Sequence, residues 1–351
     1  CWHTTFGEIS VVEPQYRRGT KRVRAFAQSA KVSHRGCSRP LQRVVTDFGA
    51  DVAFAQVMDK LVEHYGVVLG ESTIRRITEG HAQTIFETAQ LHESWPAQTG
   101  AETVIAQMDG GMVPIVEPDA AQQDKRKGKQ LQWKEAKICL AHAKGSKTLT
   151  YGGTLQGDVA QAGRQLFHCA RVAGFGSNSR LHAVGDGADW IAMQVEEKFG
   201  AQGGYLVDFY HVCDYVSAAA TAVTNTTQAA EVWMVEQKQR LKAQRVSEIM
   251  HALRPHLEPA SVGADDAPVR QCHRYLSNRM HQLDYQSALA NDLPIGSGEI
   301  ESAHRYIVQQ RLKRPGSWWR AANADHMLAL RLNRANNRWG EYWAHGFVHT
   351  A

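Results

Sequence analysis

One stretch constrains the fold more than any other: residues 180–191, an apolar run that ends in an acid between two glycines. The run from Leu181 to Val184 predicts a buried strand, and the glycines on both sides of Asp186 allow a tight turn before a helix begins near Ala188. The carboxylate of Asp186 would then lie at the carboxyl end of a strand, where open α/β sheets place their chemistry. The alternative is that Asp186 only caps the following helix. This stretch alone does not decide between the two.

A second acid lies inside an apolar run, at residues 103–115. Burying a carboxylate without a partner is costly, so Asp109 indicates either a functional site or an edge position beside a bulge at Gly110 and Gly111. Two further runs, 136–143 and 148–152, predict antiparallel strands joined by hairpins. The run that contains Asp109 is therefore expected to be the first of three consecutive strands.

The order of the expected elements indicates the fold class. A helix over 158–172 follows the three strands, and then come the strand of Asp186, its helix and a fifth strand over 205–211. This is the ribonuclease-H-like succession, an α/β fold with a mixed sheet whose first and fourth strands are neighbours. Asp109 and Asp186 would then face each other. A divalent cation relieves the repulsion between two close carboxylates, and oxygen ligands favour magnesium or manganese over zinc.

The N-terminal third carries segregated positive charge. Nine basic residues and no acid lie between Gln15 and Thr46, in a chain whose net charge is only +5. Such segregation is typical of proteins that bind a polyanion, and a solvated basic surface is the alternative. A strand is expected over residues 6–12, with a return strand over 23–26.

A helix-turn-helix outline follows the basic segment. Apolar residues recur at helical spacing over 49–65, Gly66 stops the run, and a second helix is expected from Ser72 to Trp95. Arg75 and Arg76 lie in the first turns of this second helix and are the expected DNA contacts. Many ordinary helix pairs share the same pattern, so the outline alone is not specific.

Residues 295–315, the last informative stretch, contain two glutamates on a predicted helix that begins after Ser297. Glu299 and Glu301 fall on opposite flanks of its apolar stripe. The helix dipole explains Glu299 without any function, and an ion pair with Arg305 explains Glu301 in the same way. Periodicity does not choose between them.

The length of 351 residues and an ordinary composition predict a globular protein of two or three domains. No apolar run approaches the length of a membrane span, so we expect a cytoplasmic, nucleoid-associated protein without membrane contact. Six single cysteines are typical of reduced thiols, and a chain that begins at Cys1 is expected to be part of a longer protein. The expected divisions are a basic N-terminal segment with short strands (1–48), a helix-turn-helix-like region (49–98), the first part of a ribonuclease-H-like core (99–213), a helical insertion (214–292) and the C-terminal helices of the core (293–351).

Four motifs occur in a fixed order: Met108-Asp-Gly-Gly111, Gly185-Asp-Gly-Ala-Asp-Trp-Ile191, Asp208-Phe-Tyr-His-Val212 and Gly296-Ser-Gly-Glu-Ile-Glu-Ser302. Together they resemble the DDE transposases of bacterial insertion sequences, most closely those of the ISKra type and more distantly Mutator-like enzymes. The similarity covers most of residues 103–343. It implies an enzyme that cleaves DNA at transposon ends and joins the freed 3′-hydroxyl to target DNA.

The resemblance also implies the catalytic residues. Asp109, Asp186 and Glu301 would bind two divalent metal ions, Mg²⁺ or Mn²⁺. The last acid of the family lies in a Gly-Xaa-Xaa-Glu-Ser pattern, which favours Glu301 over the other glutamate. Asp208 and His211 match an Asp-Xaa-Xaa-His signature that would position the scissile phosphate or order the site. The alternative for this pair is that it caps the next helix.

The basic and aromatic residues near the C-terminus complete the expected DNA contacts. Lys313, Arg314 and Arg305 would neutralise phosphates, whereas Trp318 and Trp319 would stack on an unpaired base or else belong to the core. The expected partner is double-stranded DNA, both transposon ends and target, bound by a homo-oligomer. Two alternatives stay open: a structure-specific DNA nuclease of the same fold, and a transposon-derived DNA-binding protein without catalysis.

Overall fold

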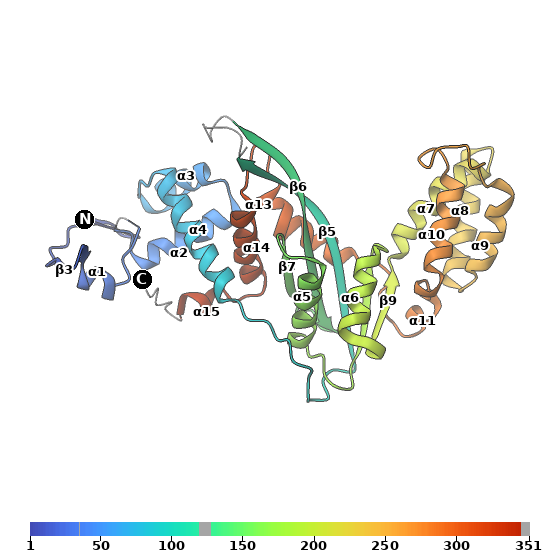
Figure 1. Cartoon of the computed structure of the whole chain (residues 1–351), viewed down its shortest axis with the longest axis horizontal. Helices are drawn as coiled ribbons and strands as arrows, with labels where there is room; N and C mark the ends of the chain where they lie inside the picture. Colours follow the sequence, from blue (N-terminus) through green and yellow to red (C-terminus); the bar gives the residue numbers. More distant parts are fainter. Residues whose placement is uncertain (35, 119–127, 345–351) are drawn as a thin grey trace.

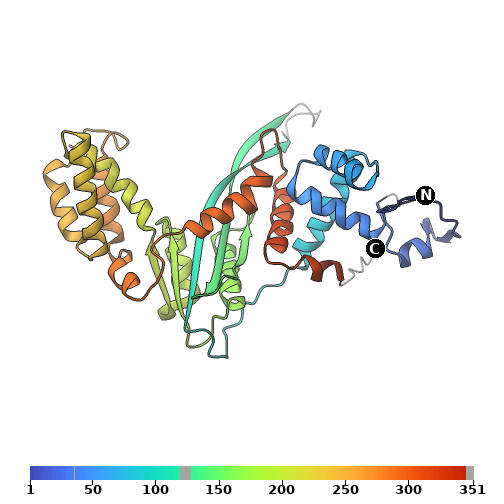
Figure 2. The ribbon, with the colours of Figure 1, turned by 180° about the vertical axis from the view of Figure 1, so that it is seen from behind.

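The computed structural model describes residues 1–34, 36–118 and 128–344. The chain is elongated, with N-terminal helices at one end, a five-stranded sheet in the middle and a second group of helices at the other end (Figure 1). Seen from behind, the C-terminal helices cross one face of the sheet and reach the N-terminal helices (Figure 2). The two ends of the sequence therefore pack together on one side of the sheet.

Two short hairpins begin the chain. β1 (Trp2–Thr4) pairs with β2 (Gly7–Ile9), and β3 (Tyr16–Arg18) pairs with β4 (Lys21–Val23). The strand expected over residues 6–12 is confirmed only over Gly7–Ile9, where β2 follows a reversal of the chain just before Gly7, which has a positive φ angle. The return strand expected over 23–26 is wrong, since the short helix α1 (Ala25–Ser29) occupies most of it.

Three helices follow: α2 (Arg39–Asp51), α3 (Phe54–Tyr65) and α4 (Glu71–Thr88). The run predicted as one helix over 49–65 is broken between α2 and α3, and Gly66 ends α3 in the left-handed conformation, as expected for a glycine C-cap. The extension of α4 to Trp95 is wrong. Trp95 lies instead in the segment that connects α4 to β5, and its ring packs on Phe167 and Phe175 of the core.

The central sheet consists of β5 (Thr103–Pro118), β6 (Lys129–Ala143), β7 (Thr150–Thr154), β8 (Arg180–Gly185) and β9 (Gly203–Val207). Its order is β7-β6-β5-β8-β9. β5 is antiparallel to β6 and parallel to β8, and β8 is parallel to β9. The expected pairing of the first strand with the fourth is therefore confirmed.

Several strands differ from expectation in their extent. β6 begins seven residues earlier than expected, and β7 lies two residues later. β5 continues through its acid without the bulge considered at Gly110 and Gly111, because Asp109 pairs with Ile138 and the two glycines continue the ladder. β9 ends at Val207 rather than at residue 211. Asp208 is the N-cap of the next helix, so the apolar residues that follow it are helical.

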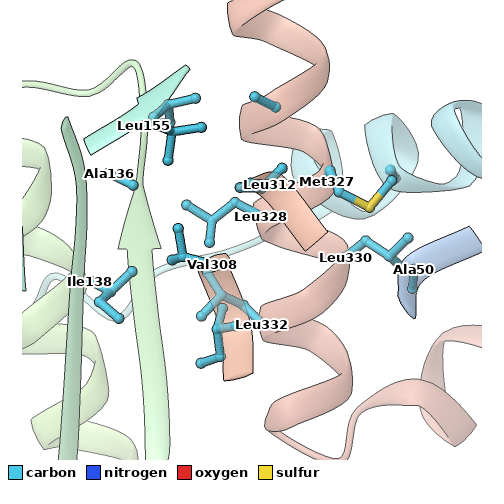
Figure 3. Close-up of a cluster of buried hydrophobic side chains, with 14 of the residues drawn as sticks. Ala50, Ala136, Ile138, Leu155, Val308, Leu312, Met327, Leu328, Leu330 and Leu332 are labelled. Atoms are coloured by element: carbon cyan, nitrogen blue, oxygen red, sulfur yellow. The ribbon is translucent and has the colours of Figure 1, made fainter. Parts of the chain in front are cut away.

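Each face of the sheet carries its own core. Even-numbered residues of β5, such as Val104 and Met108, pack against α5 (Val159–Val172) and α6 (Asp189–Phe199). The odd-numbered Val113 and Ile115 lie on the opposite face with the C-terminal helices. Figure 3 shows part of this second core, where Leu328 and Leu332 of α14 (Ala321–Ala335) lie against residues from β6. Asp109 is odd-numbered and therefore lies on the face that the C-terminal helices cover.

A group of helices follows β9: α7 (Phe209–Val223), α8 (Thr227–Lys242), α9 (Val246–Leu253), α10 (Pro268–Arg279) and α11 (Tyr285–Ala290). These helices share a core of their own. The short 3-10 helices of the chain are Gly200–Gln202, Arg254–His256 and Met280–Gln282. Whether these helices form a separate inserted domain stays a prediction.

The chain returns to the sheet through α12 (Gly298–Ala303), a π-helical segment (His304–Gln309) and α13 (Gln310–Leu312), and ends in α14 and α15 (Trp339–Ala344). Arg331 of α14 is almost fully buried and donates to the backbone carbonyls of Ile307 and Ala50. It therefore ties the C-terminal helices to α2. All six cysteines are free thiols. Within the described ranges, no helix combines the length and the apolar composition that crossing a membrane requires.

Candidate active site

The strand registers bring three acids to one edge of the sheet. Gln107 of β5 pairs with Val184 of β8, so Asp109 and Asp186 each lie two residues beyond a paired position and come level with each other. Gly185 pairs with Val207 in the same way, which places Asp208 beside Asp186. The expected meeting of the first- and fourth-strand acids therefore follows from the observed register.

Asp109 lies among charged neighbours on the covered face of the sheet. Burial raises the pKa of its carboxyl group and the nearby Asp186 adds to this rise, whereas His304, the Gly110 N–H and His211 oppose it. Oδ1 accepts a hydrogen bond from the Gly110 N–H at 2.8 Å, and Oδ2 lies 3.2 Å from Nε2 of His304. The rise in pKa therefore reflects mainly the burial of the carboxyl group, and the repulsion from Asp186 is a smaller contribution.

The turn that carries Asp186 is held from three directions. Oδ1 of Asp186 accepts the Ala188 N–H at 2.8 Å, so the side chain stabilises its own turn, while the N-cap position of α6 belongs to Ala188. The Tyr275 hydroxyl donates to the Asp186 carbonyl at 2.9 Å, and Nε of Arg279 donates to the Gly187 carbonyl at 2.8 Å. The capping alternative accounts for one oxygen of Asp186 and leaves its position beside Asp109 unexplained.

Sequence reasoning missed Tyr275 and Arg279. Both lie on α10, and the Tyr205 hydroxyl of β9 adds a third contact by accepting the Gly187 N–H at 3.0 Å. Gly187 has a φ of +90°, and a Cβ there would collide with the Tyr275 hydroxyl. The positive φ accounts for the second glycine of the motif, but nothing in the sequence spacing points to partners about 90 residues away.

Asp208 is buried and fully hydrogen-bonded. Oδ1 accepts the N–H groups of Tyr210 and His211 at 2.6 and 3.2 Å, and Oδ2 accepts both the N–H and the hydroxyl of Ser297 at 2.5 Å. The capping interpretation is therefore correct for Asp208, and the same carboxylate also fastens the start of α12 to the end of β9. Ser297 is the N-cap residue of α12, as expected, but its hydroxyl bonds Asp208 instead of the helix.

His211 lies in the first turn of α7, not on a strand as expected. It is close enough to Asp109 to lower the pKa of that carboxyl group. Its place beside the paired acids comes from the cap that Asp208 makes, because this cap fixes the first turn of the helix. The two residues of the motif thus differ: Asp208 holds the backbone, and His211 acts on Asp109 through its charge.

The two glutamates of α12 lie in different surroundings. Glu299 accepts hydrogen bonds from Gln107 at 3.1 Å and from His142 of β6 at 3.2 Å, and it raises the pKa of His142. Glu301 is exposed, and the expected ion pair with Arg305 is absent from the described interactions. Glu299 therefore contacts the strand of Asp109 through Gln107, whereas Glu301 has no contact with Asp109 or Asp186 within the described residues. The assignment of Glu301 as the third acid stays a prediction.

His304 is a site residue that the sequence did not single out. It is 4% exposed, and its Nε2 faces Asp109 without a hydrogen bond. Burial lowers its pKa, and the charge and backbone of Asp109 oppose this. A Cβ on Gly111 would lie 2.6 Å from the His304 ring, so this glycine makes room for the histidine. The π-helical segment begins at His304, a feature that is frequent at functional sites.

The expected DNA contacts are spread over the N-terminal and C-terminal helices. Arg75 and Arg76 are exposed on α4, and Arg305 and Lys313 are exposed on the C-terminal helices. Arg314 donates to the Asp51 carbonyl at 3.2 Å. Of the two tryptophans, Trp318 is 64% exposed, whereas Trp319 is 5% exposed and belongs to the core. The stacking interpretation is therefore wrong for Trp319.

The donor set fits a hard divalent cation in part. Asp109 and Asp186 repel each other, and each has one oxygen bonded to a backbone N–H. The second oxygen of Asp186 is left for a ligand, whereas that of Asp109 lies 3.2 Å from Nε2 of His304, which a cation there would have to displace. Nevertheless, no three carboxylate, imidazole or thiolate groups in the described part of the chain converge closely enough to hold a metal ion. Glu301 must turn toward the pair to complete such a set.

Comparison of the sequence with models of known protein families and with curated proteins finds no match.

Proposed function

We propose that the chain is a DDE-type polynucleotidyl transferase, a transposase that cleaves DNA at transposon ends and joins the 3′-hydroxyl to target DNA. The observation that carries the proposal is the paired placement of Asp109 and Asp186 on two neighbouring parallel strands. The strand order supports it, because the first three strands form an antiparallel meander and the fourth returns beside the first, as in a ribonuclease-H-like fold.

The chemistry needs negative charge to be stabilised on both sides of a phosphorus atom. Asp109, Asp186 and Glu301 are the residues that would hold two ions, Mg²⁺ or Mn²⁺. When bound, such ions supply Lewis-acid stabilisation of the attacking and leaving oxygens. Asp109 and Asp186 are presented by rigid strands, whereas Glu301 is exposed on a helix.

Other side chains keep these acids in place. His304 packs against Asp109 and limits its rotation, and Tyr275 and Arg279 fix the turn of Asp186. Asp208 fixes the start of α12 through Ser297 and thereby positions the helix that carries Glu301. The expense of burying Asp208 is offset by four hydrogen bonds, which is the pattern of a group that orders a site.

The proposed partner is double-stranded DNA, both the transposon ends and the target, and the proposed working form is a homo-oligomer on DNA in the nucleoid. Exposed cations on the N-terminal and C-terminal helices support this, among them Arg75 and Arg76 on α4 and Lys313 after α13. Contacts of this kind make binding weaken steeply with salt.

The test is a cleavage and joining assay with the genomic DNA that flanks the reading frame. The wild-type chain with Mg²⁺ should nick the ends and form a joined product, and Asp109→Asn should abolish both. Glu117→Gln is the matched control, because Glu117 is on the same strand and only pairs with Lys134 at 3.2 Å near the surface. Cleavage without a joined product would instead identify a nuclease, and cleavage that survives Asp109→Asn would contradict the proposed site.

A further inference from the structure

A pocket with a volume of about 440 Å³ lies where the N-terminal helices meet the far end of the β5–β6 hairpin. Its walls come from the start of α3, the exposed side of α4, the end of β5 and the segment between α13 and α14. The Val116 N–H donates to the Trp319 carbonyl at 2.8 Å and joins that segment to β5. This volume falls within the range of about 300–1,000 Å³ that is usual for ligand pockets.

Positive charge predominates in the walls of this pocket. The charged lining residues are four cations and two acids: Arg75, Lys129, Arg311, Arg320, Glu71 and Glu79. One acid is already engaged, because Glu79 accepts a hydrogen bond from Asn323 at 2.9 Å. Burial raises the pKa of Glu79, and Arg75, Arg311 and Arg320 oppose this rise without forming an ion pair with it. The cationic side chains of the pocket therefore outnumber its acids, and within the described part of the chain no ion pair with Glu79 neutralises them.

Arg311 is the unusual member of this lining. It is 2% exposed, and its guanidinium lies 4.7 Å from the centre of the Phe54 ring and 4.7 Å from the centre of the Trp319 ring. Nε donates to the Gly49 carbonyl at 2.9 Å, but Nη2 is buried without any hydrogen-bond partner. Burial lowers the pKa of Arg311 to about 10, so the group is still charged at neutral pH. Glu79 and Asp51 oppose this lowering, but neither forms an ion pair with Arg311 within the described residues, and an anion in the pocket would stabilise the buried charge further.

Two further arginines are open to a ligand. Arg75 and Arg320 are exposed, and neither forms an ion pair or a hydrogen bond within the described residues. They come from α4 and from the residue before α14, so the pocket draws its cations from segments that are far apart in sequence. Guanidinium groups bind phosphate in a two-pronged geometry, which favours a phosphate over a smaller anion.

An aromatic surface lies beside these cations. Trp318 is 64% exposed, and Nζ of Lys129 lies 4.9 Å from the centre of its ring. An exposed ring beside cations is a combination that suits a nucleotide, because the base can stack on the ring and the phosphate can bind the charges. An acidic peptide would use the cations but would gain little from the ring.

We infer that this pocket binds one nucleotide of a DNA strand, with its phosphate at Arg75, Arg311 and Arg320 and its base on Trp318. The inference rests on the proposed function, because the pocket would be a DNA-binding site separate from the paired acids. It also explains why α4 and the segment before α14 meet, since each contributes part of one binding site.

The test uses the full chain with Asp109→Asn, in EDTA, so that no cleavage occurs. The probe is a short single-stranded oligonucleotide that carries fluorescein and 5-iodouracil. Trp318→Ala should weaken binding about tenfold, the loss of one stacked base, and Trp318→Phe should retain most of it. Arg320→Gln should weaken binding and reduce the salt dependence by about one phosphate contact. Arg274→Gln, which removes an exposed charge from α10, is the matched control and should change nothing.

Photocrosslinking locates the bound base. Ultraviolet light should join the iodouracil to the peptide that contains Trp318, and Trp318→Ala should abolish that adduct. Unchanged binding in Trp318→Ala and Arg320→Gln would overturn the inference, and so would an adduct elsewhere in the chain or equal competition by an acidic peptide. Failure of the proposed function has a different signature. In that case the wild-type chain with Mg²⁺ does not cleave DNA, while the pocket variants still lower oligonucleotide binding.

Discussion

Asp208→Asn gives the sharpest test of how the fold holds the site. The carboxylate is 1% exposed and accepts four hydrogen bonds, two from the first turn of α7 and two from Ser297. An amide offers one oxygen, so its NH₂ group must face one of these two pairs of donors. If it faces Ser297, the hydroxyl can turn and accept, but the Ser297 N–H is left buried and unpaired.

The magnitude follows from these bonds. An unpaired buried donor costs about 1–3 kcal/mol, and the remaining bonds lose the assistance of the negative charge, so the expected loss of stability is about 2–4 kcal/mol. Urea unfolding followed by fluorescence measures this loss, and hydrogen exchange should rise over α12. Asp284→Asn is the control, because Asp284 is an exposed N-cap that accepts the Ser287 N–H at 3.0 Å, and asparagine caps almost equally well. The reasoning is refuted if Asp208→Asn is no less stable than this control.

Three further predictions concern the site and the core. Gly187→Ala should destabilise more than Gly66→Ala in thermal unfolding: both positions have a positive φ, which costs about 1 kcal/mol for alanine, but only at Gly187 would a Cβ collide with Tyr275; equal losses would contradict the clamp on the Asp186 turn. Glu301→Gln should lower Mg²⁺-dependent cleavage about 100-fold or more, whereas Glu299→Gln should retain most of it, and the reverse order would assign the third acid to Glu299. His168 accepts a hydrogen bond from the backbone N–H of His92, and burial lowers the pKa of His168 from 6.5 to about 4. The stability of the folded chain should therefore fall as the pH drops from 6.5 toward 4. His168→Gln keeps the acceptor and should flatten this decline in the urea midpoint, and an unchanged slope would show that His168 does not cause it.

The meeting of Asp109 and Asp186 could be predicted from the order of the expected elements. A helix between two strands returns the chain in a parallel direction, and the ribonuclease-H-like succession puts the fourth strand beside the first, which brings the end of the fourth strand level with Asp109 inside the first. The strand over 180–185 was equally clear, because an apolar run followed by glycine has few alternatives. The ribonuclease-H-like assignment and the metal site stay predictions.

Other features of the structure depend on contacts between distant residues, which the periodicity of the sequence does not predict. The apolar run through Phe209 and Tyr210 continues the pattern of β9, and only the bonds of Asp208 show that a helix has begun. Tyr275 and Arg279 reach the Asp186 turn from a distant helix, as Arg311 reaches α2 from α13. Neighbouring tryptophans look alike in sequence, but the bridge between Ile115 and Trp319 turns one inward and leaves Trp318 exposed.

The most direct test of the central claim is whether the paired acids bind a divalent ion. Mn²⁺ binding, measured by electron paramagnetic resonance, should be strong in the wild-type chain, should be lost in Asp109→Asn and in Asp186→Asn, and should be unchanged in Glu117→Gln. Equal Mn²⁺ binding by all four proteins would contradict the claim, because the repulsion between Asp109 and Asp186 would then not be relieved by a metal ion at this site.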